Sequence, residues 1–78
     1  MNGWLVCYET ALDDIPLRLF RDRTEAMRWA KDLKPEQAVM LAGYAERQLT
    51  EQLQLSIVRF TPGGRASKHF IVKELDEE

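Results

Sequence analysis

The segment Thr61-Pro62-Gly63-Gly64-Arg65 is the strongest turn signal in the chain, and it lies between two runs of alternating apolar and polar residues. Proline presets the φ angle for the first corner of a turn, and the two glycines after it can take the positive φ angles that close one. The stretch from Leu53 to Leu75 is therefore predicted to be a β-hairpin, and a hairpin implies a fold with an antiparallel sheet.

The first strand of this hairpin changes its apolar face along its length. Leu53, Leu55 and Ile57 share one face, whereas Val58 and Phe60 lie on the other. A β-bulge near Ile57 and Val58 would bring both sets to one side, and a regular strand would be apolar on both faces. The last strand is also apolar on both sides, so we expect a second covering layer or a contact between subunits.

A second hairpin is predicted near the amino terminus. Residues 4–8 are rich in β-branched and aromatic side chains, and residues 15–20 alternate between apolar and polar. The alternation places three apolar residues on one face, namely Ile15, Leu17 and Leu19. The polar loop between the two strands has hairpin length, and Pro16 indicates an edge position or the beginning of a strand.

The first of two predicted helices follows directly. Asp22 can accept a hydrogen bond from the backbone N–H of Glu25, whose side chain can reach back, which is the pattern of a capping box. The helix is expected to run to about Leu33. Its apolar stripe consists of Ala26, Trp29, Ala30 and Leu33. Trp29 contributes most of the area of that stripe, so we expect it at the centre of the helix face that packs on the sheet.

Residues 35–49 leave two alternatives open. Pro35 suits the first turn of a helix. The helical period is kept by Ala38, Leu41, Ala42, Ala45 and Leu49. Gly43 nevertheless costs about 1 kcal/mol relative to alanine inside a helix, and residues 38–42 also fit a short buried strand, because periodicity does not separate the two. We predict a second helix over residues 37–48.

The order strand, strand, helix, helix, strand, strand predicts an α+β domain of two layers. Both hairpins are expected to share one antiparallel sheet, with the helices packed on one of its faces. Residues 1–78 are too few for more than one core, so we expect a single domain. The acidic residues 74–78 are predicted to be a short solvated tail.

The composition offers little for catalysis or for cofactors. The chain has one cysteine and one histidine, so zinc sites of the usual Cys and His spacing are excluded, and we expect no metal and no other cofactor. Cys7 and His69 are the only pair that could act as a thiol nucleophile and an imidazole base. A thiol in the middle of an apolar strand, however, lacks the surroundings that lower its pKa. A single cysteine without a signal segment predicts a cytoplasmic protein without disulfides.

The function is therefore predicted by elimination to be a protein-interaction or regulatory module that is not an enzyme, because a domain this small has little room for a catalytic pocket. The expected contact, including that of a homodimer, consists of Val58, Phe60, Ile71 and Leu75. The alternative is a nucleic-acid-binding protein. Its contacts would be Arg59, Arg65, Lys68 and Lys73, with Phe60 and Phe70 as platforms for stacked bases. An enzyme whose site forms only between subunits is a third hypothesis, and no membrane contact is expected.

Overall fold

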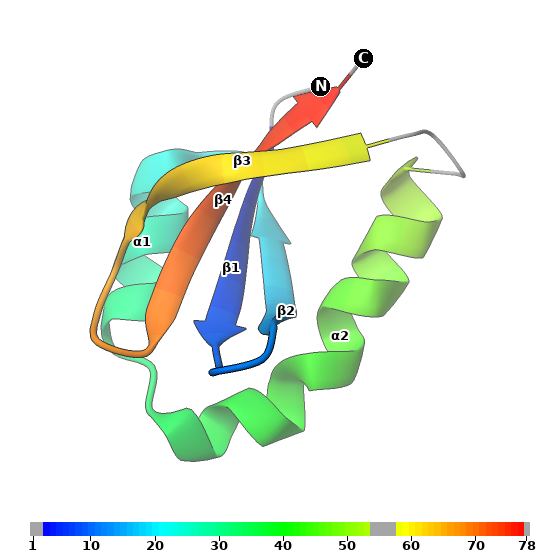
Figure 1. The fold of residues 1–78 in the computed structure, drawn as a ribbon. Helices are drawn as coiled ribbons and strands as arrows, with labels where there is room; N and C mark the ends of the chain where they lie inside the picture. Colours follow the sequence, from blue (N-terminus) through cyan, green and yellow to red (C-terminus); the bar gives the residue numbers. More distant parts are fainter. Residues whose placement is uncertain (1–2, 54–57, 78) are drawn as a thin grey trace.

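In the computed structural model the backbone is described for residues 3–53 and 58–77, and the side chains for residues 3–44, 47 and 59–76. The elements are β1 (Trp4–Glu9), β2 (Asp14–Phe20), α1 (Arg23–Lys31), α2 (Pro35–Leu53), β3 (Val58–Arg65) and β4 (Phe70–Glu77). Figure 1 shows one open sheet, whose antiparallel strands follow the order β2-β1-β4-β3. The predicted α+β class and element order are confirmed, and Pro16 lies on an edge strand as expected.

The first hairpin contains a β-bulge that the sequence does not predict. The pairing of β1 and β2 shifts by one residue between Val6 and Cys7, which leaves Leu17 without a partner. Ile15 and Leu17 therefore pack with the core on the helix side, whereas Leu19 packs on the opposite face. The prediction that the three alternating residues share one face is wrong for Leu19, because a bulge reverses the alternation that follows it.

Helix α1 begins as predicted. A side-chain oxygen of Asp22 accepts a hydrogen bond from the backbone N–H of Glu25 at 3.1 Å. Ala26 and Ala30 are the fully buried residues of α1, and they pack with side chains of the sheet. Trp29 is only half-buried and packs at the margin of the core, so its predicted central position is wrong. Small side chains let a helix approach a sheet closely, and the large ring then has room only at the side.

Residues 35–53 form a helix, which resolves the alternative of a short strand in favour of α2. Pro35 is its first residue, and the side-chain oxygen of Gln37 accepts a hydrogen bond from the backbone N–H of Lys34 at 2.8 Å. This bond satisfies a donor at the beginning of the helix. The helix packs on β2, with Ala38 buried and Leu41 half-buried against the core.

The last hairpin does not turn where the sequence predicts. Strand β3 continues through Pro62, Gly63 and Gly64 to Arg65, and the chain turns over residues 66–69. In β3 the pairing moves past Gly63, which has no partner, and Gly64 has a φ angle of 125°. The two glycines therefore form a β-bulge, which uses the same positive φ that a turn would need. The predicted strand residues before Val58 fall in α2, which ends at Leu53, or outside the described residues.

The predicted acidic tail is also wrong over residues 74–77, which belong to β4. The backbone N–H of Leu75 donates a hydrogen bond to the carbonyl oxygen of Gly3 at 2.8 Å. The side chain of Leu75 is 6% exposed. Pairing with β3 along residues 74–77, and with β1 at Glu74, orders this segment despite its charge.

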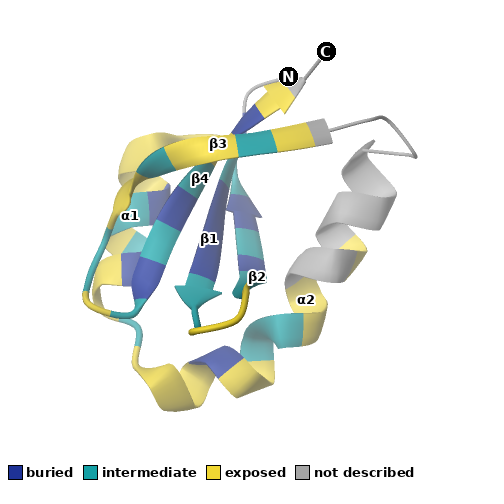
Figure 2. Cartoon of the chain, viewed as in Figure 1, coloured by how far each residue is buried: buried dark blue, intermediate teal, exposed yellow. Residues whose placement is uncertain are grey.

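The sheet carries apolar side chains on both faces. On the helix side, Val6, Phe70 and Val72 pack with buried residues of both helices. On the opposite face, Leu5 and Cys7 pack with side chains of the neighbouring strands. Figure 2 shows that the central strands β1 and β4 are the most deeply buried part of the sheet. The face opposite the helices therefore holds a second, smaller core.

Candidate functional site

Cys7 and His69, the nucleophile and base that the composition offers, are not brought together. The Cys7 side chain is 1% exposed on the face opposite the helices. Burial raises the pKa of its thiol to about 11, and the nearby Lys73 ammonium lowers that pKa less than burial raises it. The His69 ring stacks on Tyr8, which packs with the core on the helix side. A protonated, buried thiol without a neighbouring base is a poor nucleophile at neutral pH.

The described residues, 3–53 and 58–77, also contain no cluster of three His, Cys, Asp or Glu side chains that could hold a metal ion. Within the same ranges, no helix combines the length and the apolar character that crossing a membrane requires.

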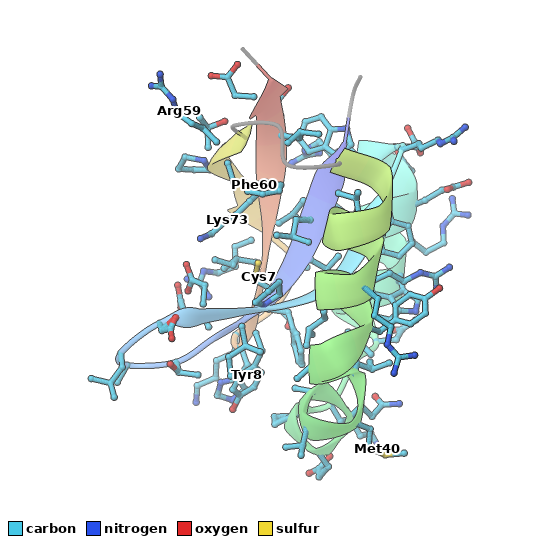
Figure 3. All side chains as sticks on the ribbon, turned by 90° about the vertical axis from the view of Figure 1, so that its right-hand side faces the viewer. Cys7, Tyr8, Met40, Arg59, Phe60 and Lys73 are labelled. Carbon is cyan, nitrogen blue, oxygen red and sulfur yellow. The ribbon has the colours of Figure 1, made fainter. Side chains whose placement is uncertain are left out.

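A groove of about 490 Å³ lies on the face of the sheet opposite the helices. We call it the sheet groove. It is lined by Phe60, Pro62, Gly64 and Arg65 of β3, Ile71, Val72 and Lys73 of β4, and Glu9 and Asp14 of the first hairpin. Figure 3 shows Phe60 and Lys73 on the side of the sheet away from the helices. The volume of the sheet groove is in the range of pockets that hold small ligands or single side chains.

Two ion pairs cross the sheet groove and join the two hairpins. Arg65 Nη2 lies 2.7 Å from Glu9 Oε1, and Lys73 Nζ lies 2.8 Å from Asp14 Oδ2. The hydrogen bond to Asp14 raises the pKa of Lys73 above its usual value. Glu9 and Asp14 are partners in the pairing of β1 and β2, so the two acids lie side by side at the end of that hairpin. The groove thus has a charge-balanced wall.

The four predicted nucleic-acid contacts do not form one basic surface. Arg65 and Lys73 are paired with acids, and Arg65 also donates a hydrogen bond to the carbonyl oxygen of Lys68 at 3.0 Å. Lys68 is exposed in the turn, whereas Arg59 lies towards the other end of β3, opposite Asp76.

The predicted pair of stacking aromatics is not available either. Phe70 is 1% exposed and belongs to the core on the helix side. Phe60 packs on the opposite face. The prediction that both rings offer platforms for bases is therefore wrong for Phe70.

The predicted interaction residues are brought together only in part. Phe60 and Ile71 are half-buried and line the sheet groove. Leu75 is buried and cannot reach a partner without rearrangement, because it packs tightly beside Gly3. The side chain of Val58 lies outside the described residues. Among the described residues, Phe60 and Ile71 therefore lie where a partner could reach them, and the contact itself stays a prediction.

The outer face of α2 is a second candidate surface, and the sequence analysis missed it. Val39, Met40 and Tyr44 are 83%, 86% and 51% exposed. Figure 3 shows Met40 on the side of α2 away from the sheet. We call this surface the α2 stripe, and it consists of Glu36, Val39, Met40, Gly43, Tyr44 and Arg47. The helical period contained the signal, because these residues lie opposite the apolar face assigned to the core.

Comparisons of the chain with protein-family models, with curated proteins and with solved structures gave no match. The sheet groove and the α2 stripe are therefore the two candidate binding surfaces.

Proposed function

We propose that the protein is an interaction module without catalytic activity, and that the sheet groove binds a short extended segment of a partner protein. The observation that carries this proposal is the groove itself, with Phe60 and Ile71 on its apolar side and two ion pairs across it. An apolar side chain of the partner would rest on these two residues, and polar groups of its backbone would meet the exposed charges.

The balance of charge favours a protein segment over a nucleic acid. Binding to a phosphate backbone draws its affinity from unneutralised Lys and Arg side chains. The two cations of the groove, Arg65 and Lys73, are instead matched by Glu9 and Asp14 at hydrogen-bond distance. A peptide carries both signs of charge and can exchange partners with either ion pair.

The open edge of β3 is a weaker candidate for the same partner. A peptide that extends a sheet needs a regular row of backbone donors and acceptors. Pro62 has no backbone N–H, and the bulge at Gly63 interrupts the row after it. These features protect the edge from further pairing, so the proposal places the partner on the face of the sheet.

We also propose a cytoplasmic location. The only cysteine of the chain, Cys7, is a free and buried thiol, which suits a reducing compartment.

The test uses a phage library of random peptides of about ten residues, which span roughly 33 Å when extended. Enriched peptides are titrated calorimetrically against the wild type, Phe60→Ala and the control Leu12→Ala. Leu12 is 98% exposed and does not line the groove. We expect Phe60→Ala to weaken binding about tenfold or more and Leu12→Ala to leave it unchanged.

Circular dichroism of Phe60→Ala is the control that distinguishes a loss of binding from a loss of folding. Failure to enrich any peptide, or equal binding to Phe60→Ala and the wild type, would overturn the proposal. Oligothymidylate is the second probe. Tight binding of this probe that weakens steeply with salt would favour the nucleic-acid alternative.

A further inference from the structure

The α2 stripe is an apolar surface that the rest of the protein does not cover. Val39 and Met40 keep more than four fifths of their surface in contact with solvent. At 100° per residue, the six residues of the stripe fall on one face of the helix, within an arc of about 140°. A monomer rarely keeps large apolar side chains together on one exposed helix face without a partner for them.

We propose that the α2 stripe binds the same stripe of a second copy of this chain, with the two helices antiparallel and a two-fold axis midway between Met40 and Gly43. In such a pair, residues whose numbers add up to 83 face one another. Glu36 then meets Arg47 of the partner subunit, and Val39 meets Tyr44 of the partner subunit. Met40 meets Gly43 of the partner subunit, so the surface is complementary to itself, as a two-fold contact requires.

The charges of the stripe select the antiparallel orientation. Glu36 and Arg47 lie at opposite ends of it, roughly 16 Å apart along the helix axis. Both are exposed, and within the described residues neither takes part in an ion pair. An antiparallel pair places each acid beside a base. A parallel pair would place like charges together at both ends.

Gly43 provides the space that the contact needs. A Cβ atom built on Gly43 meets no atom within 4 Å, so the surface of the helix is hollow at this position. The axes of two packed helices lie about 8–10 Å apart. The distance is about 8 Å where the residues between the helices are small. The flexible Met40 side chain of the other copy fills such a hollow well. A contact of this kind gives a reason for a glycine inside a helix.

This proposal is independent of the sheet groove. The groove is formed by the two hairpins, and Figure 1 shows α2 beside the β2 edge of the sheet. A dimer through α2 leaves both grooves accessible, and two grooves in one particle would bind a partner with repeated segments more tightly than one groove.

The test is sedimentation equilibrium at low salt, where surface charges are screened least. We expect the wild type to dimerise, and Glu36→Arg and Arg47→Glu each to weaken self-association about tenfold or more, because each change creates two like-charge contacts per dimer. A mixture of these two variants should form a heterodimer with the affinity of the wild type, because both ends then pair opposite charges. Lys31→Glu is the control, because Lys31 is an exposed residue of α1 outside the stripe, and this change should leave self-association unaltered.

A wild type that remains a monomer at the highest soluble concentration would overturn the proposal. A dimer that neither charge reversal weakens would overturn it as well, because the contact would then lie elsewhere. Failure of the mixture to associate would contradict the antiparallel register. Met40→Glu provides a second variant, and helical circular dichroism distinguishes loss of association from loss of folding.

Discussion

Gly63→Ala tests the bulge in β3 directly. An added Cβ would lie 3.0 Å from the carbonyl oxygen of Val72 and 3.1 Å from the backbone nitrogen of Glu74. It would also lie 3.1 Å from Cζ3 of Trp4. All three distances are shorter than an ordinary contact of about 3.5–4.0 Å. The first two atoms belong to the backbone of β4, which also pairs with β1 and has little freedom to move away.

The expected cost of Gly63→Ala is that of overpacking a well-ordered site, about 1–3 kcal/mol of the free energy of unfolding. Gly43→Ala is the matched control, because it adds the same atom inside a helix where no atom lies within 4 Å. Alanine is the better helix former, so this change should raise the free energy of unfolding by roughly 0.5–1 kcal/mol. Replacing glycine by alanine is therefore expected to lower the free energy of unfolding at Gly63 and to raise it at Gly43.

Urea titration followed by tryptophan fluorescence measures both effects, at protein concentrations low enough to keep the chain monomeric. With a slope of about 1 kcal/mol per molar urea, the midpoint should fall by about 1–3 M for Gly63→Ala and rise by about 0.5–1 M for Gly43→Ala. A wild-type midpoint for Gly63→Ala would show that this glycine does not lie against β4. The assignment of a bulge in place of a turn would then be wrong.

Three further predictions concern single side chains. The pKa of the Cys7 thiol is raised to about 11 from 9.0, so the unfolded chain ionises first and the free energy of unfolding should fall between pH 9 and 11. Cys7→Ala should lose this part of the pH dependence in urea titrations, and an identical profile would contradict it. Phe70→Ala should lower the free energy of unfolding by about 3–5 kcal/mol and Trp29→Ala by less, because Phe70 is 1% exposed and Trp29 is half-buried. A larger loss for Trp29→Ala than for Phe70→Ala in urea titrations would place Trp29 at the centre of the core. Asp14→Asn should lower the pKa of Lys73 towards 10.5 in an NMR titration of the ammonium group, and an unchanged pKa would refute the ion pair.

The candidate sites were predictable only in part. The absence of a Cys and His metal site follows from the composition, and Phe60 and Ile71 stood out because their strands are apolar on both faces. The ion pairs of the groove were not predictable, because Arg65 and Glu9 are 56 residues apart and meet only through the pairing of β1 with β4. The α2 stripe was not predictable from periodicity alone, because Val39 and Met40 are apolar like the core residues of the helix and only the packing of α2 on β2 leaves them exposed.

The sequence by itself determined the order of the elements and, apart from residues 35–49, their kind. Alternation of apolar residues, the cap at Asp22 and the proline at position 35 are local signals, and local backbone preferences are enough to make strands and helices there. The tertiary structure decided which face each residue occupies. Leu19 lies on the face opposite Leu17 because of a bulge in β2. The two glycines suit a turn, but they form a bulge because the backbone of β4 lies directly beside Gly63. A positive φ angle serves a turn and a bulge equally well, and only the pairing of distant strands selects between them.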